Sequence, residues 1–249
     1  MNDRHAQILD VVNEYKKVEV YRLAEMLDVS QVTIRKDLDI LAERGLLDRE
    51  HGYALCRKAD DVNNKLAVRY ESKMKIAVAA AEMVSDGETI MVESGSSCTL
   101  LAEQVAKTKK DITIITNSAF IASYIRDKGN VRIILLGGEY QRETQAMVGP
   151  LLKKFANEFF VDKLFIGTDG FIPKVGFTSG EMMRMEAVHN MAESARQVII
   201  LTDSSKFQKQ GVVLQFRFSE VSKIVTDSGV SDEVKKLLEK NHIDVTVAY

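Results

Sequence analysis

Seven short apolar runs, separated by longer stretches of helical pattern, constrain the fold of residues 65–249 more than any other feature of the sequence. They are TIMVE, DITIIT, VRIILLGG, KLFIGTDG, QVIILTD, KIVTD and DVTVAY, which begin at residues 89, 111, 131, 163, 197, 223 and 244. Continuous Ile, Val and Leu are typical of strands that are buried on both faces, with helices as the connections. The runs therefore predict an α/β fold with a mainly parallel sheet.

The first 58 residues have a different pattern. Apolar residues at helical spacing predict helices over about residues 3–15, 21–28 and 31–44, the third capped by Ser30. The residues expected to face inward are Ile8, Val12, Tyr15, Leu23, Leu27, Ile34, Leu38 and Leu41. His51 and Gly52 predict a tight turn between two short extended runs. Three helices followed by a hairpin are the plan of a winged helix-turn-helix, whose third helix enters the major groove of DNA.

The segment between these two patterns, ADDVNN at residues 59–64, is polar and has no apolar periodicity. We expect it to be a linker. The prediction is a DNA-binding domain over residues 1–58, a linker over 59–64, and an α/β domain for sensing and oligomerisation over 65–249.

The charge balance requires DNA binding to depend on where the positive charges lie. Residues 1–57 contain nine Lys and Arg against eleven Asp and Glu, and the whole chain has a formal charge of −2. The predicted contacts with double-stranded DNA are base contacts from Gln31, Thr33 and Arg35, phosphate contacts from Ser30 and Lys36, and a wing contact from His51. An ordinary amphipathic surface helix is the alternative interpretation of this segment.

Polar residues follow five of the apolar runs, where open α/β sheets bind their ligands. They are Glu93, Ser94, Gly95, Ser96 and Ser97; Thr116 and Asn117; Gly137 and Gly138; Asp169 and Gly170; and Lys206. Free amides at the start of a helix, together with Lys206, would bind an anion. The carboxylates and Asn117 suit sugar hydroxyls. The set predicts a phosphorylated sugar or sugar alcohol as ligand, although each loop by itself also fits an ordinary turn.

Other classes of site receive little support from the sequence. Two cysteines and four scattered histidines have no zinc-ligand spacing, and we expect no metal, no cofactor and no catalytic residue. No apolar run approaches the ~20 residues that cross a bilayer, and the first residues have no apolar signal core. We therefore expect a cytoplasmic protein without a membrane partner.

These residues resemble a known family, the DeoR-type bacterial transcriptional repressors of sugar metabolism. The residues that carry the resemblance in the first part are Arg4, Ile8, Val12, Ser30, Thr33, Ile34, Arg35, Lys36, Asp37 and Leu38. In the second part they are ESGSS in place of the usual DSGTT, followed by the pairs and loops TN, LGG, GTDG, DSSKF and TD. The resemblance covers essentially the whole chain. It departs at Glu93, which replaces an aspartate, and at Tyr53, where a second glycine is common after His-Gly.

The resemblance implies a fold similar to sugar-phosphate isomerases for the second part, and a homodimer or homotetramer that places several winged helices on spaced half-sites. A phosphorylated effector would shift the arrangement of those heads. The segment VDKLFIGTDGF is similar to repressors of glucitol operons. Two alternatives stay open: a sugar-phosphate isomerase or deaminase fused to a DNA-binding head, and a protein–protein adaptor that uses the winged helix for docking.

Overall fold

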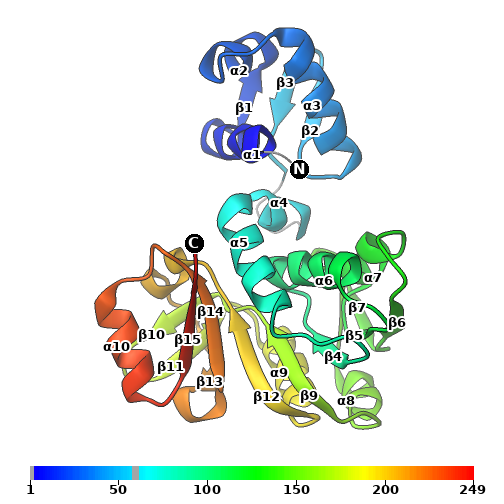
Figure 1. Ribbon diagram of the computed structural model, residues 1–249, viewed down its shortest axis with the longest axis vertical. Helices are drawn as coiled ribbons and strands as arrows, with labels where there is room; N and C mark the ends of the chain where they lie inside the picture. Colours follow the sequence, from blue (N-terminus) through cyan, green and yellow to red (C-terminus); the bar gives the residue numbers. More distant parts are fainter. Residues whose placement is uncertain (1–2, 58–61) are drawn as a thin grey trace. The chain divides into compact units, whose positions relative to one another are not determined.

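The structure is a computed structural model that describes residues 3–57 and 62–249. The chain forms two compact units, residues 1–71 and 72–249, and Figure 1 colours it along the sequence from blue to red. Residues 59–61 of the expected linker lie outside the described residues. Residues 62–64 are helical and buried, because Val62 and Leu66 form a short apolar face and Asn64 accepts a hydrogen bond from the Cys56 thiol. The first unit therefore extends further along the chain than the sequence indicates.

The first unit has the predicted three helices and hairpin. Its elements are α1 (Asp3–Tyr15), β1 (Lys17–Glu19), α2 (Val20–Met26), α3 (Gln31–Glu43), β2 (Asp48–Glu50), β3 (Tyr53–Leu55) and α4 (Val62–Ala67). The strands form an antiparallel sheet in the order β1-β3-β2. The sequence predicted β2 and β3 as a two-stranded wing, to which β1 adds a third strand.

The core of this unit contains most of the predicted inward residues. Ile8, Leu23, Ile34, Leu38 and Leu41 are fully buried, and Val12 is nearly so. The expectation for Tyr15 is wrong, because its side chain is 45% exposed and lies 5.3 Å from the guanidinium of Arg22. Tyr15 ends α1, and the chain turns at Lys16, whose φ is +65°. Leu27 is only half-buried, since α2 ends before it.

A buried ion pair connects α1 to α3. Asp37 is 4% exposed; it accepts hydrogen bonds from Nε of Arg4 at 2.5 Å and from Nη2 of Arg4 at 3.2 Å, and Nε2 of His5 lies 3.0 Å from its Oδ1. Burial acts to raise the pKa of Asp37, but the hydrogen bonds from Arg4 and His5 outweigh it and lower that pKa below its usual value. The ion pair between Arg4 and Asp37 therefore holds α3 against α1.

The second unit has one seven-stranded parallel sheet, visible in Figure 1. Its strands are β4 (Thr89–Val92), β5 (Thr113–Thr116), β6 (Arg132–Leu135), β9 (Val161–Ile166), β12 (Ala195–Leu201), β14 (Lys223–Asp227) and β15 (Asp244–Ala248). The order is β15-β14-β12-β9-β4-β5-β6, and every neighbouring pair is parallel. Each of the seven predicted runs supplies one of these strands, so the fold class predicted from the sequence is confirmed.

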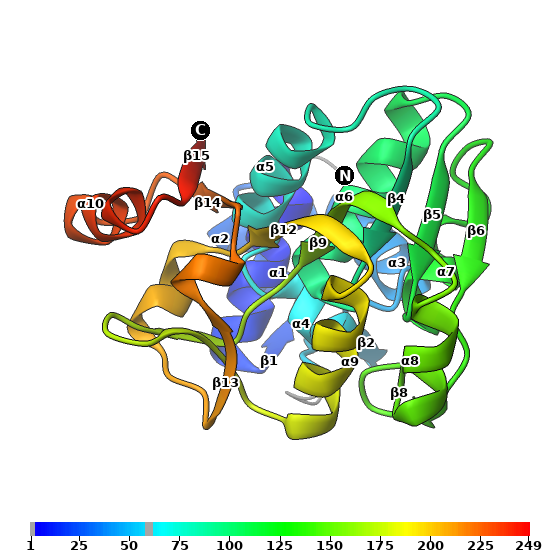
Figure 2. The ribbon, with the colours of Figure 1, turned by 90° about the horizontal axis from the view of Figure 1, so that it is seen from below.

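Helices and two small sheets complete this unit. The helices are α5 (Tyr70–Ala81), α6 (Ser96–Thr108), α7 (Ala119–Ile125), α8 (Pro150–Ala156), α9 (Met182–Ala192) and α10 (Asp232–Lys240), with 3-10 turns η1 (Ser204–Gln208) and η2 (Phe218–Glu220). The small sheets, which were not predicted, pair β7 (Glu139–Gln141) with β8 (Ala146–Val148), and β11 (Gly176–Ser179) with β10 (Gly170–Ile172) and β13 (Val213–Arg217). Figure 2 shows α9 beside β9 and β12. No helix of the described residues is long and apolar enough to span a membrane.

The strand order changes direction at the centre of the large sheet. From β4 the chain proceeds to β5 and β6 on one side, whereas β9, β12, β14 and β15 extend on the other. Strands β4 and β9 are therefore neighbours whose following segments diverge. Such a switch point leaves a crevice at the carboxyl ends of the strands, which is the usual ligand position in open α/β sheets.

Candidate DNA-binding and effector sites

The predicted DNA-reading residues lie together at the start of α3. Ser30 caps the helix, since its Oγ accepts a hydrogen bond from the Thr33 amide at 3.1 Å. The Oε1 atom of Gln31 accepts a hydrogen bond from Nη2 of Arg35 at 3.1 Å. Gln31, Arg35 and Lys36 are exposed, and Thr33 is half-buried. The cap and the buried Ile34 thus hold one end of the helix with its polar side chains open to solvent.

The wing contacts α3 through an ion pair. An ion pair joins Arg49 of β2 to Asp39 of α3, and the tight turn at the tip consists of exposed His51 and Gly52, the latter with φ +86°. Tyr53 donates its hydroxyl hydrogen bond to Glu19 of β1, and the Lys17 ammonium lies 4.6 Å from its ring. Tyr53 is therefore engaged within the sheet, which leaves His51 as the predicted wing contact.

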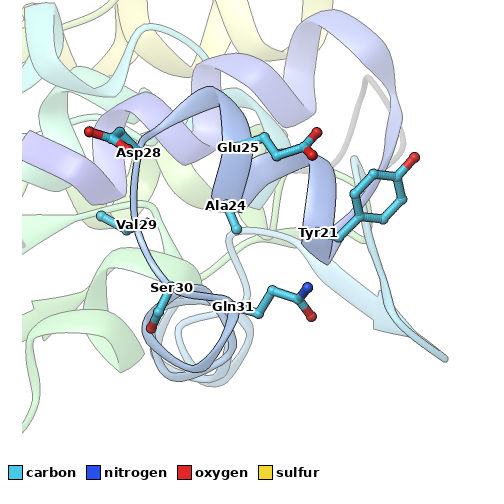
Figure 3. A pocket seen from close by; sticks show the side chains of 7 residues that line it. All are labelled: Tyr21, Ala24, Glu25, Asp28, Val29, Ser30 and Gln31. Carbon is cyan, nitrogen blue, oxygen red and sulfur yellow. The ribbon is translucent and has the colours of Figure 1, made fainter.

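A hollow of about 550 Å³ lies between α2 and the start of α3. Figure 3 shows its lining residues, Tyr21, Ala24, Glu25, Asp28, Val29, Ser30 and Gln31. The two carboxylates of Glu25 and Asp28 make this hollow unfavourable for a phosphate group. Phosphate groups of DNA would therefore be expected to meet Ser30 and Lys36 from a direction away from the hollow.

At the switch point of the large sheet, the Glu93 carboxylate joins two loops. Its Oε2 accepts hydrogen bonds from the amides of Gly95 at 2.9 Å and Gly167 at 3.1 Å, and its Oε1 accepts one from the Ser94 hydroxyl at 2.9 Å. Burial raises the pKa of Glu93, and these donors oppose the rise. A Cβ on Gly95 would lie 2.9 Å from Oε2 of Glu93, so this turn requires glycine.

Helix α6 begins directly after this turn. Its N-cap residue is Gly95, which provides no side-chain cap, and Ser96 and Ser97 are its first two residues. The first amides of a helix have no partner within the helix and attract anions. The predicted segment from Glu93 to Ser97 is therefore divided: Glu93 organises the loop, and the helix start offers hydrogen-bond donors.

Asp169, after β9, belongs to a second cluster of charges. Its Oδ2 accepts a hydrogen bond from the Gly180 amide at 2.9 Å and lies 3.4 Å from Nη2 of Arg184. Glu181 caps α9 by accepting from the amides of Met183 and Arg184, and its Oε2 lies 3.6 Å from Nε of Arg184. Burial acts to raise the pKa of Glu181, but these donors lower it. The sequence reasoning missed Arg184 and Glu181, because they follow a strand of a small sheet that it did not predict.

The remaining predicted residues differ in how accessible they are. Asn117 is 2% exposed and donates to the Met147 carbonyl at 3.1 Å. Thr116 is fully buried, and its hydroxyl accepts from the Ser118 amide. Gly137 packs against the ring of Phe155, where a Cβ would lie only 2.7 Å from the ring. Glycines 138 and 170 are similarly crowded by neighbouring backbone. Thr116 and the three glycines are therefore packed closely against neighbouring groups, and their contact with an effector stays a prediction.

Lys206 lies in η1, beside two organised carboxylates. Asp203 accepts from the Ser205 amide at 3.1 Å, and Asp227 accepts from the amides of Ser204 at 3.1 Å and Gly229 at 2.9 Å. Lys206 is half-buried, and its ammonium has no hydrogen-bond or ion-pair partner among the described residues. Across residues 3–57 and 62–249, no group of three His, Cys, Asp or Glu side chains could hold a metal ion.

A winged helix-turn-helix with polar side chains on an open α3, carried by a chain with a seven-stranded α/β domain, defines a DNA-binding regulator. Residues 4–59 match the family model described as DeoR-like helix-turn-helix domain, and residues 68–228 match the one described as DeoR C terminal sensor domain. The chain belongs to the DeoR family and is a DNA-binding transcriptional regulator.

Similar proteins are matched over nearly their whole length. The transcriptional repressor AccR of Agrobacterium fabrum is 29% identical over 96% of this chain and 94% of its own. An L-fucose operon activator of Haemophilus influenzae is 29% identical, and the glycerol-3-phosphate regulon repressor of Escherichia coli 28%, with 98% and 97% of both chains covered. A solved ribose 5-phosphate isomerase A of Methanocaldococcus jannaschii is 18% identical over 56% of this chain and 55% of its own; its TM-score of 0.42 is too low to establish a shared fold.

Proposed function

We propose that the protein represses a sugar or sugar-alcohol utilisation operon and that a phosphorylated sugar, bound at the strand ends of the large sheet, controls it. The start of α6 carries this proposal, because its first amides have neither a partner within the helix nor a side-chain cap and follow β4 at the switch point beside β9. Two of the relatives are named for fucose and for glycerol-3-phosphate, which supports a phosphorylated carbohydrate as the ligand class. In this proposal the chain acts in the cytoplasm as a homodimer or homotetramer.

The proposed DNA contacts are Gln31, Thr33 and Arg35 on bases, and Ser30, Lys36 and His51 on the backbone. The proposed phosphate ligands are the amides at the start of α6 together with Lys206, whose ammonium lacks a partner among the described residues. Arg184 adds a second cation close to the same loops, since its charge acts on Glu93.

Binding of purified protein to its operator, selected from random duplex DNA, tests the proposal when it is repeated with sugar and polyol phosphates and with their unphosphorylated parents. A phosphorylated compound should change operator affinity, and its parent should not. If no phosphorylated compound changed either operator affinity or the melting temperature, the effector part of the proposal would be wrong.

An enzyme that converts sugar phosphates is the second candidate, and Glu93 is the observation that favours it. A buried carboxyl with a raised pKa suits acid–base catalysis. However, both oxygens of Glu93 already accept hydrogen bonds from the loops that it organises. We therefore propose that the site binds its ligand without converting it. Turnover of a sugar phosphate at about 1 s⁻¹, ordinary for an enzyme, would contradict this.

A further inference from the structure

The carboxylates around the strand ends are occupied by the protein's own backbone. Every one of the five accepts at least one amide hydrogen bond, and the five are Glu93, Asp169, Glu181, Asp203 and Asp227. They hold the loops in place. Acceptors without any donor are found among other side chains.

Two buried carboxamide oxygens at the strand ends have no partner in the described part of the chain. Asn117 follows β5, and its Oδ1 accepts no hydrogen bond although the residue is only 2% exposed. Gln215 of β13 is 5% exposed, and its Oε1 is likewise without a donor. A buried polar atom without a partner costs free energy, and in native proteins it commonly marks the place of a water or a ligand.

Gln215 belongs to the site through its amide nitrogen. Its Nε2 donates to the Gly167 carbonyl at 3.0 Å, and the Gly167 amide donates to Glu93. The backbone carbonyl of Gln215 in turn contacts Nε2 of His189 in α9. The Gln215 carboxamide is therefore fixed against the loop that follows β9, although β13 belongs to a small sheet.

The two side chains are held by segments on opposite sides of β4, the strand that Glu93 follows. Asn117 ends β5 and Gln215 contacts the end of β9, and β5 and β9 are the two neighbours of β4. Neighbouring strands are ~4.8 Å apart, so β5 and β9 are separated by about 10 Å, a span similar to a six-carbon chain with its end groups. A ligand that fills this crevice would meet an acceptor on each side.

We propose that Asn117 and Gln215 determine the specificity of the effector site by accepting hydrogen bonds from ligand hydroxyl groups, so that the effector is a phosphorylated polyol or sugar and not a phosphorylated sugar acid. The inference rests on the proposed function and deepens it. A ligand carboxylate has no proton to donate at neutral pH, would leave both oxygens unpartnered, and would lie among five carboxylates of the protein.

The test is calorimetric titration of the full-length protein with glucitol 6-phosphate, glucose 6-phosphate, fructose 6-phosphate, 6-phosphogluconate and inorganic phosphate. We expect at least one hydroxyl-terminated compound to bind about tenfold or more tightly than 6-phosphogluconate, since one hydrogen bond to a buried group is worth about that factor. Equal or tighter binding of the sugar acid would overturn the proposal.

Single substitutions test whether the Gln215 carboxamide contacts the ligand. Gln215→Met should weaken the preferred ligand about tenfold, leave inorganic phosphate unchanged, and remove the penalty for one deoxy analogue of that ligand. Gln210→Met, at an exposed position, is the matched control and should change nothing. Unchanged affinity in Gln215→Met would show that a water molecule, and not the effector, satisfies the oxygen.

Two further outcomes separate the hypotheses. If Gln215→Met does not fold, the series of deoxy analogues on the wild-type protein decides: equal affinity for every analogue contradicts hydroxyl recognition. If no sugar or polyol phosphate of the wider screen described above changes operator affinity or the melting temperature, the proposed function itself fails and the inference fails with it. Weaker binding of the preferred ligand by Gln215→Met, with unchanged binding by Gln210→Met, supports the inference.

Discussion

At the scale of single residues, Arg35 and Asp37 on α3 have opposite roles. Arg35 is exposed and donates a hydrogen bond to Gln31 of the same helix, whereas Asp37 is buried and binds Arg4 of α1. The first is free to meet DNA, and the second keeps the helix in position. Substitution of Arg35 should therefore affect operator binding, and substitution of Asp37 should affect stability.

Arg35→Ala should abolish specific operator binding without unfolding the protein. A bidentate contact with a base contributes about 1–3 kcal/mol of discrimination, and an exposed side chain contributes little to the core. Fluorescence anisotropy with specific and scrambled duplexes measures the loss, and circular dichroism checks the fold. Arg196→Ala, at a residue whose side chain is 70% exposed in the other unit, is the control. Retained specificity would show that Arg35 does not contact bases in the major groove.

Asp37→Asn should destabilise the first unit by about 1–3 kcal/mol, because the buried side chain of residue 37 loses the charge-assisted hydrogen bonds that it accepts from Arg4. The pKa of Asp37 is lower in the folded state than in the unfolded chain. Its contribution is therefore complete above the unfolded pKa, about 3.9, and is lost as the pH falls through the folded value. Urea denaturation from pH 7 to pH 3 should show the difference between wild type and Asp37→Asn shrinking below about pH 4.

The matched control for that experiment is Asp39→Asn on the same helix. Its ion pair with Arg49 is exposed, with 59% of the Asp39 side chain accessible. Exposed pairs contribute at most about 1 kcal/mol, so this variant should stay close to the wild type at every pH. Equal losses in the two variants would mean that burial of the Asp37 pair has no special effect.

At the scale of elements, α6 and η1 start at the same edge of the sheet and supply different kinds of positive charge. The start of α6 offers backbone amides next to the Gly95 turn, and η1 carries Lys206. Backbone amides cannot be removed by substitution of a side chain, so the lysine is the better probe of the phosphate site.

Lys206→Ala should leave operator binding intact and should weaken the response to the effector about tenfold or more, since one charge-assisted contact to a phosphate is lost. The shift in operator affinity at increasing glucose or glucitol phosphate measures this response. Lys209→Ala, three residues further and exposed, is the control. Equal loss of operator binding and effector response in Lys206→Ala would argue against a separate sensing site.

At the scale of the whole molecule, the formal charge of −2 limits how DNA can be bound. Several positive charges of the first unit are neutralised by ion pairs, among them those of Lys17, Arg49 and Arg57. Non-specific affinity should therefore be modest, and several heads in an oligomer should be needed for tight binding.

Operator affinity should fall with salt at a slope that corresponds to a small number of phosphate contacts per head, at about 0.9 per contact in log K against log salt. Titrations between about 50 and 200 mM salt, combined with sedimentation to fix the oligomeric state, measure the slope per head. A slope that matched ten or more contacts per head would contradict local charge placement as the basis of binding.

The sequence was sufficient to predict the seven strands, the three helices with their wing, the Ser30 cap and the loops that follow the strands. These depend on local periodicity and on residues within a few positions of one another. The glycine turn at Gly95 and the start of α6 were predicted for the same reason.

Which side chains have hydrogen-bond partners, and which do not, depends on contacts between distant parts of the folded chain. Tyr15 and residues 62–64 were misjudged, because burial at the end of a short helix depends on distant partners. Arg184 and Gln215 reach the strand ends from small sheets formed by pairings far apart in the chain. Hydrogen bonds across such separations give Glu93 and Asp169, whose contact with a ligand stays a prediction, a part in holding the loops, since only the folded chain brings the backbone amides to them.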